Sequence, residues 1–128
     1  PCPNKQKCVN DVCEWECKPE TVYFEFDESK LLTDAKDALK RNAECMKQLD
    51  MPMKIDGHCD DRGSDDYNMA LGTRRFQAVV KFLKTLGVKQ PLCGVSFGES
   101  RPTCGGQDEG CWSRNRRAET DINQVCPK

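Results

Sequence analysis

Apolar residues repeat at two different spacings along this chain and so predict strands and helices in alternation. Residues 22–26 alternate and are rich in aromatic and β-branched side chains, which predicts a first strand. Residues 53–58 also alternate, with Met53, Ile55 and Gly57 on one face, and predict a second strand. A third short strand is expected at residues 92–97, and a last one at residues 117–125.

Two helices are predicted between these strands. Thr33 is expected to cap a helix that runs to about Leu49 and carries apolar residues at three- and four-residue spacing. A second helix begins near Tyr67 and ends at Gly87, whose expected left-handed conformation stops it, while Pro91 keeps it from resuming. The order of elements predicts an α+β two-layer sandwich, βαβαββ, with both helices on one sheet face.

One charged residue falls inside the apolar stripe of the second helix. Arg75 lies one turn after Leu71 and one turn before Val79. An unpaired buried charge is strongly unfavourable, so this guanidinium needs a carboxylate from the chain or from a ligand. Asp60, at the end of the second strand, is the nearest candidate, and we expect the two to pair when no ligand is bound.

The composition limits the classes of partner. With 128 residues the chain forms one domain of ordinary size and a small appendage, and 37% apolar against 32% charged residues predicts a modest core. A net charge of -1 with interspersed signs gives no reason to expect nucleic acid or an anionic membrane surface as partner. No glycine-rich phosphate loop is present, and no cofactor or metal is expected.

The chain contains ten cysteines, too many for a reducing cytosol, and their even number predicts a full set of disulfides in an exported protein. It begins at Pro1 without methionine and has no apolar run suited to a signal peptide or membrane span, so we expect a mature fragment of something longer.

The cysteines are unevenly distributed. Residues 1–20 are expected to form a disulfide-stapled segment ahead of a domain at residues 21–128, and they contain Cys2, Cys8, Cys13 and Cys17. A zinc site there is disfavoured because no Cys-x-x-Cys pair is present. A Cys104–Cys111 bridge would close about eight residues and stabilise by ~2.5 kcal/mol in the entropic model. Three connectivities remain open for Cys45, Cys59, Cys93 and Cys126.

For two polar residues near the second strand, we expect no part in catalysis or ligand binding. His58 is the only histidine, and a catalytic dyad with Cys59 is disfavoured because adjacent strand residues point to opposite faces. We expect His58 to make an orienting hydrogen bond or to lie at the surface. Asn68 is expected to act as a helix cap or to hold the preceding turn.

Several short motifs occur together in one order. They are Val-Tyr-Phe-Glu-Phe-Asp at 22–27, Gly-His-x-Asp-x-x-Gly at 57–63, Tyr-Asn at 67–68, Leu-Gly-x-Arg-Arg at 71–75 and Ser-Arg-Asn-Arg-Arg at 113–117. In this order the chain resembles the OmpA-like C-terminal domain family, closest to its peptidoglycan-associated lipoprotein (Pal) branch. The resemblance covers about four fifths of the chain, from Thr21 to Asn123.

The resemblance implies noncovalent binding of the diaminopimelate residue in a peptidoglycan stem peptide. By motif position Asp60 takes the ligand's ammonium and Arg75 its carboxylate, with Arg62 as a second donor. A carboxylate and a planar guanidinium fork suit the zwitterionic end of that residue. The expected cleft is completed by Phe26, Asp27 and Leu71.

The family also implies a place in the cell. The chain would be a binding module, not an enzyme, that tethers the outer membrane to the wall from its periplasmic face in a Gram-negative bacterium. A lipid or membrane anchor upstream of Pro1 and a TolB-like periplasmic partner follow from the same resemblance. The Asn-Arg-Arg at 115–117 is expected to pair with acidic groups of the loop after the second strand.

Two other classes of function stay open. An exported thiol-disulfide or wall-modifying enzyme is disfavoured because the chain lacks both Cys-x-x-Cys and a nucleophile beside a positioned base. In a purely structural cysteine-rich adhesive domain, Asp60 and Arg75 would simply satisfy each other. Cys59 departs from the family pattern, where small or hydroxyl residues are common at that position.

Overall fold

A four-stranded mixed sheet forms the centre of the protein in a computed structural model that describes residues 2–122. Its strand order is β3 (Val22–Tyr23), β6 (Arg117–Asp121), β4 (Met53–His58) and β5 (Leu92–Gly98). The two central connections differ, since β4 runs parallel to β5 but antiparallel to β6. Strand β3 forms one edge and is antiparallel to β6.

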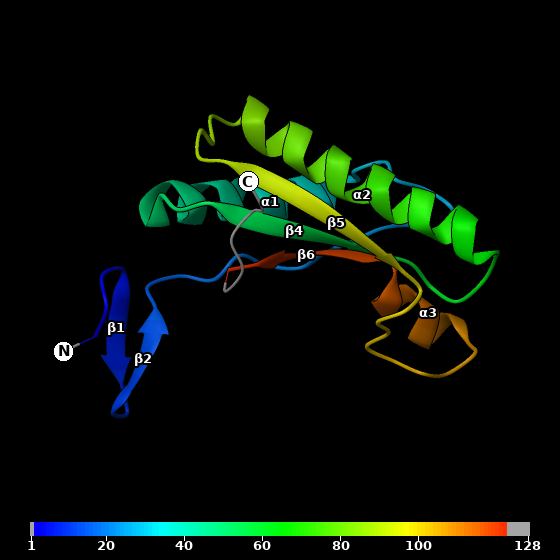
Figure 1. The fold of residues 1–128 in the computed structure, drawn as a ribbon, viewed down its shortest axis with the longest axis horizontal. Coiled ribbons are helices and arrows are strands. Elements are labelled where there is room, and N and C mark those ends of the chain that lie inside the picture. Colours follow the sequence, from blue (N-terminus) through cyan, green and yellow to red (C-terminus); the bar gives the residue numbers. More distant parts are fainter. Residues whose placement is uncertain (1, 123–128) are drawn as a thin grey trace.

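Two long helices, α1 (Thr33–Leu49) and α2 (Asp65–Thr85), cover one face of this sheet, as Figure 1 shows. This arrangement confirms the predicted α+β two-layer fold. A third helix, α3 (Glu109–Asn115), lies toward the other side of the sheet and was not predicted. No helix within residues 2–122 combines the length and the apolar character needed to cross a membrane.

The core lies between the sheet and the two long helices. Met46, Ile55 and Leu83 are 0% exposed, and together they join α1, β4 and α2. Burying such side chains contributes roughly 1.5–3 kcal/mol each, so this layer supplies most of the driving force for folding. The core therefore fixes β4 and α2 relative to each other.

Several predicted boundaries differ from the observed ones. The first strand is shorter than predicted and ends at Tyr23, which pairs with Arg117, the first residue of β6. Thr33 is not the cap of α1; Leu32 is, without a side-chain hydrogen bond. Helix α2 begins at Asp65, two residues before the predicted start. The last strand is described only to Asp121, and residues 123–125 of the prediction lie outside the described residues.

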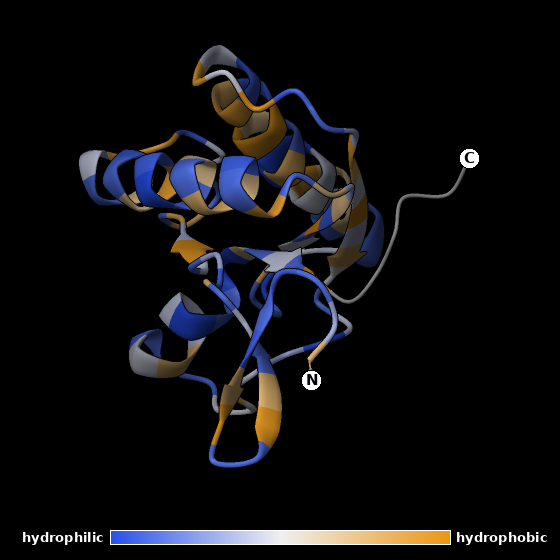
Figure 2. Ribbon diagram, turned by 90° about the vertical axis from the view of Figure 1, so that its left-hand side faces the viewer, coloured by the Kyte–Doolittle hydropathy of each residue, from blue (hydrophilic) through white to orange (hydrophobic). Residues whose placement is uncertain are grey.

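An unpredicted β-hairpin precedes the sheet. It pairs β1 (Gln6–Val9) with β2 (Val12–Trp15) and projects from the rest of the molecule (Figures 1 and 2). Asn10 and Asp11 at its tip have φ values of 50° and 65°, the left-handed pair of a two-residue type I′ turn. Asn and Asp tolerate this conformation better than other non-glycine residues, which gives the turn its sequence signal.

The cysteine pairing is only partly as expected. The predicted Cys104–Cys111 bridge is confirmed, and the others given by the structure are Cys2–Cys13 and Cys17–Cys45. The N-terminal segment is thus also stapled to α1. Cys93 is disulfide-bonded too, while Cys126 lies outside the described residues. The expectation of a full set was wrong, because Cys8 and Cys59 are free thiols.

Candidate functional site

The six residues proposed for ligand binding lie together around one cavity of about 310 Å³. We call this cavity the Asp60 cleft, and it is lined by Phe26, Asp27, Cys59, Asp60, Arg62, Gly63, Tyr67, Asn68, Leu71 and Arg75. Its walls come from three places in the chain: the exit of β3, the loop after β4 and the first turns of α2. Two carboxylates and two guanidiniums therefore meet in one small space.

A larger cavity of about 520 Å³ lies beside β3 and the start of α1. Its lining includes two carboxylates, Glu25 and Asp34, and one cation, Arg116. Arg116 already binds a carboxylate and a backbone carbonyl. We place the candidate site in the smaller Asp60 cleft because opposite charges are paired in its walls.

Asp60 is 4% exposed and is bound chiefly by the residue two positions later. Its Oδ1 accepts the backbone N–H of Arg62 at 3.0 Å, and its Oδ2 accepts that residue's Nη2 at 2.8 Å. Arg116 lies 3.5 Å from Oδ2. Burial alone would raise the pKa of Asp60, but the bonds from Arg62 and Arg116 hold it below its ordinary value. The carboxylate is therefore ionised and preorganised.

The predicted pairing of Asp60 with Arg75 is wrong. Arg75 is 0% exposed, and its guanidinium donates to three backbone carbonyls instead: Glu28 at 2.9 Å, His58 at 2.8 Å and Glu25 at 3.1 Å. Burial lowers the pKa of Arg75, although an arginine stays protonated in a protein. Three backbone carbonyls thus bind N–H groups of the Arg75 guanidinium, in place of the carboxylate that the sequence led us to expect.

Arg62 is held between two aromatic rings. Its Cζ lies 3.9 Å from the ring centroid of Phe26 and 3.9 Å from that of Trp112. A guanidinium has two faces, so rings at this distance occupy one each. Its Nε is buried and has no hydrogen-bond partner among the described residues. Arg62 thus presents one unsatisfied donor beside Asp60.

The rim of the cleft is partly exposed. Phe26 is 52% and Tyr67 42% exposed. The hydroxyl of Tyr67 donates to Asp27, which links the exit of β3 to the first turn of α2. Helix α2 begins there because the Ser64 side chain accepts the N–H of Tyr67 at 3.1 Å. Leu71 is buried and supplies an apolar patch of the wall.

Asn68 holds the loop between β4 and α2, which is one of the two roles predicted for it. Its side-chain amide donates to the carbonyls of Asp60 at 3.4 Å and Arg62 at 3.1 Å and to Glu99 at 3.1 Å. The Cys59 thiol donates to the carbonyl of Asn68 at 3.1 Å. Burial raises the pKa of Cys59 to about 11, which makes it a poor nucleophile.

His58 fits neither of its two predicted roles. It is 2% exposed, so it is not a surface residue, and neither ring nitrogen has a hydrogen-bond partner among residues 2–122. Its ring stacks on Phe97 with centroids 5.4 Å apart. Burial, followed by the charge of Arg117, lowers the pKa of His58 to about 4. The 3.9 Å approach to Glu119 is therefore no ion pair near neutral pH.

The Asn-Arg-Arg motif pairs with acidic groups, although only one of them belongs to the loop after β4. Arg116 reaches Asp60 and also bonds Glu109 at 2.6 Å. Arg117 bonds Glu119 at 2.6 Å. The amide of Asn115 holds the backbone of residues 103 and 104. No group of three or more His, Cys, Asp or Glu within residues 2–122 is arranged to hold a metal ion.

Sequence reasoning missed Trp112. Its indole Nε1 donates to Asp61 at 2.8 Å, and Gln107 donates to the same carboxylate. These bonds join the segment around α3 to the loop after β4, more than forty positions earlier in the chain. The signal available was weak, since it consisted of an Asp at position 108 and an aromatic residue four positions later. The side chain of Asp108 caps α3 by accepting the N–H of Cys111 at 2.9 Å.

Comparisons with known proteins show which sequences this chain resembles. The model of the OmpA family matches residues 23–116. The peptidoglycan-associated lipoprotein of Pseudomonas aeruginosa is 44% identical over 100 residues, which are 77% of this chain and 60% of that protein. The protein of the same name from Mesorhizobium japonicum is 38% identical over 104 residues, 80% of this chain and 62% of that protein. The chain thus spans about three fifths of the length of these relatives.

Solved structures resemble the fold. The crystal structure of the peptidoglycan-associated lipoprotein from Burkholderia pseudomallei superposes with a TM-score of 0.74 at 36% identity, and the match covers 78% of this chain and 86% of that one. The C-terminal domain of Helicobacter pylori MotB gives a TM-score of 0.68 at 21% identity, covering 81% and 87%. At that identity the second likeness concerns the fold alone.

Proposed function

The chain belongs to the OmpA family, and from that premise we propose that the Asp60 cleft binds peptidoglycan by holding the diaminopimelate residue of a stem peptide. The observation that carries the proposal is the meeting of Asp27, Asp60, Arg62 and Arg75 around one cavity. The names of the relatives, peptidoglycan-associated lipoproteins, support the class of ligand.

The ammonium of the ligand is assigned to Asp60. A carboxylate offers about four lone-pair sites, and Asp60 uses one for the backbone of Arg62 and one for its guanidinium at hydrogen-bond distance. The remaining capacity suits an ammonium with three N–H donors. Because the carboxylate is already ionised, binding requires no proton release at neutral pH.

The carboxylate of the ligand has two candidate donors. The side chain of Arg62 is 32% exposed, whereas Arg75 is fully buried, so Arg62 is the donor that a ligand meets first. Arg75 uses three of its five N–H groups on carbonyls, which leaves two. It lines the cleft but is fully buried, so it is the less accessible of the two donors.

The expected affinity is modest. About three charge-assisted contacts of ~1.5–3 kcal/mol each, reduced by desolvation and by the cost of association, give a dissociation constant on the order of micromolar to millimolar. A weak site is sufficient in a cell wall because many copies of the same stem peptide surround each anchored protein.

The cellular role follows from this binding. We propose that the chain tethers the outer membrane of a Gram-negative bacterium to its wall from the periplasmic face, through a lipid or membrane anchor upstream of Pro1. A TolB-like protein is the proposed periplasmic partner. Residues 1–20 would be an attachment to the binding domain at residues 21–128, since Cys17–Cys45 joins the two.

Calorimetry with two stem tripeptides tests the proposed function. One carries diaminopimelate and the other carries lysine, which has the ammonium but lacks the second carboxylate. We expect the lysine peptide and the variants Asp60→Asn and Arg62→Ala to bind roughly 10-fold to 100-fold more weakly. Arg114→Ala, a change at an exposed arginine outside the cleft, is the control and should bind like wild type. Equal affinity for both peptides, or no binding by wild type, would refute the proposal.

A further inference from the structure

Trp112 lies on α3 and packs against the guanidinium of Arg62, a residue of the Asp60 cleft. The Arg62 guanidinium lies against its ring at 3.9 Å, as it does against Phe26 on the other face. Arg62 binds Asp60 through one Nη, while its buried Nε has no partner among the described residues. The two rings are therefore the contacts that fix the plane of this guanidinium.

One hydrogen bond holds Trp112 over the loop after β4, and a second holds Gln107 to the same carboxylate of that loop. Its Nε1 donates to Asp61 Oδ1 at 2.8 Å, and the Gln107 amide donates to the other oxygen of that carboxylate. The indole and the Gln107 side chain thus both bind this one carboxylate. Asp61 immediately follows Asp60, so these bonds tie the indole to the loop that carries the carboxylate of the site.

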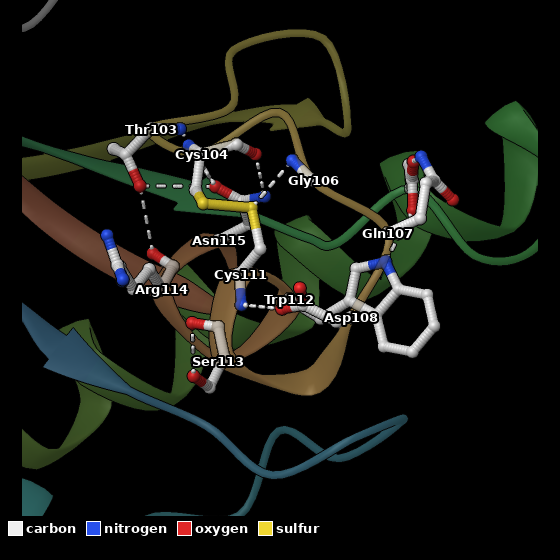
Figure 3. Close-up of a disulfide and its surroundings, with 12 residues drawn as sticks. Thr103, Cys104, Gly106, Gln107, Asp108, Cys111, Trp112, Ser113, Arg114 and Asn115 are labelled. Atoms are coloured by element: carbon white, nitrogen blue, oxygen red, sulfur yellow. Dashed lines mark hydrogen bonds between the residues drawn. A yellow bond between two sulfur atoms is a disulfide. The ribbon is translucent and has the colours of Figure 1, made fainter.

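A disulfide fixes the backbone that carries Trp112. Helix α3 has seven residues, too few to be stable alone. The Cys104–Cys111 bridge ends one position before Trp112 (Figure 3). The Asn115 amide donates to the carbonyl of Cys104 at 2.7 Å and accepts the N–H of Thr103 at 2.8 Å. Bridge and amide together close the loop 104–111 into a rigid support for the indole.

We propose that Trp112 is a positioning residue for ligand binding, and that the Cys104–Cys111 bridge sets its place. The proposal rests on the proposed function. A ligand ammonium that takes the remaining acceptor sites of Asp60 neutralises that carboxylate and so weakens its charge attraction for Arg62. The two aromatic rings then keep the guanidinium in the cleft, where it faces the ligand's carboxylate. Trp112 thus acts through Arg62 and needs no contact with the ligand.

The test measures affinity for the diaminopimelate tripeptide by calorimetry in the full chain. Trp112→Ala should weaken binding by roughly 3-fold to 10-fold, the range of a partly desolvated cation–π contact. Trp112→Phe keeps a ring and should stay within about 2-fold of wild type. The double variant Cys104→Ser/Cys111→Ser should reproduce the loss seen in Trp112→Ala.

The coupling with Arg62 separates positioning from a general structural effect. If Trp112 acts through Arg62, adding Trp112→Ala to Arg62→Ala should produce no further loss of affinity. If Arg62→Ala alone abolishes binding, the double variant cannot be measured. The deciding observation is then that Trp112→Ala binds the tripeptide more weakly than Trp112→Phe while the two variants melt at the same temperature. Wild-type affinity in Trp112→Ala, or an equal loss in both backgrounds, overturns the inference alone. Absence of binding by wild type overturns the proposed function and this inference with it.

Discussion

Gly57 of β4 and Gly72 of α2 lie backbone against backbone. A Cβ added to Gly57 would lie 2.0 Å from the Gly72 carbonyl oxygen, closer than any real contact permits. Asp60 follows Gly57 by three residues, and Arg75 follows Gly72 by nearly one helical turn. The closeness of the two glycines therefore sets how far apart the carboxylate and the guanidinium of the cleft lie.

Replacing Gly57 with alanine should disturb both stability and binding. The obstacle is backbone, which cannot rotate away, so β4 and α2 must separate. We expect a loss of about 1 to 3 kcal/mol in the free energy of unfolding, as for other overpacked sites. Thermal melting of Gly57→Ala checks this, with Gly105→Ala as the control because a Cβ at Gly105 meets nothing within 4 Å. An unchanged melting temperature would mean that the contact is not tight in solution.

The positions of the cleft residues could be predicted because local patterns carry them. The apolar stripe of α2 predicted that Arg75 is buried, and the motif after β4 placed Asp60 and Arg62 beside it. The partners of Arg75 could not be predicted. They are backbone carbonyls, two of them 47 and 50 positions earlier, and a carbonyl leaves no mark in the sequence. The wrong expectation came from seeking a side-chain anion for every buried cation.

The role of Trp112 and the β1–β2 hairpin could not be predicted from the sequence for a different reason. Helix α3 is only seven residues long, so no apolar period of 3.6 residues can reveal it. The contact of Trp112 with Arg62 also spans fifty positions, and only the folded chain brings the two together. The β1–β2 strands have four residues each and mostly exposed side chains, so they lack the alternation by which a half-buried strand is recognised.

His58 should make the protein less stable in mild acid. Its pKa is lowered to about 4 by burial first and then by Arg117, with Arg101 and Lys54 adding to the effect and Glu119 opposing it. An unfolded chain takes up this proton near its ordinary pKa of 6.5. Between these pH values the unfolded state binds more protons, so stability rises with pH and falls toward acid. The folded protein should lose roughly 3 kcal/mol from this residue across that window.

Urea unfolding of wild type and His58→Gln between the two pKa values checks this slope. The variant should lack the contribution of His58. The unfolding free energy of wild type minus that of the variant should therefore decrease as the pH falls. Its remaining acid sensitivity should come from groups such as Asp60, whose lowered pKa makes its contribution disappear at lower pH. Parallel curves for the two proteins would show that His58 is not buried in its neutral form.

The free thiols of Cys8 and Cys59 should differ sharply in reactivity. Cys8 is exposed, whereas Cys59 is 3% exposed, donates to the carbonyl of Asn68 and has a pKa raised to about 11. Alkylation of the native protein should therefore modify Cys8 and leave Cys59 intact, because the thiolate is the reacting form. Peptide mapping after labelling in denaturant without reductant should then find Cys59 modified. Rapid native labelling of Cys59 would argue that the cleft opens more than the structure indicates.

The two N-terminal disulfides should contribute unequally to the stability of the sheet. Cys2–Cys13 closes the hairpin on itself, while Cys17–Cys45 joins the chain before β3 to α1 across 28 positions. The second bridge closes a stretch of chain that contains β3, so its loss frees a segment of the core. We expect Cys17→Ser/Cys45→Ser to cost about 2 to 4 kcal/mol and to lower the melting temperature by on the order of 10 °C.

Cys2→Ser/Cys13→Ser is the matched control for that prediction. The hairpin strands pair only with each other, and a lone two-stranded hairpin is marginally stable, so this bridge stabilises the hairpin and not the sheet. The main thermal transition should stay at the wild-type temperature, while amides of β1 and β2 should exchange faster with solvent. If both double variants melted at the same temperature, the hairpin and the sheet would have to unfold as one unit, and Cys17–Cys45 would have no special role in holding β3 against the core.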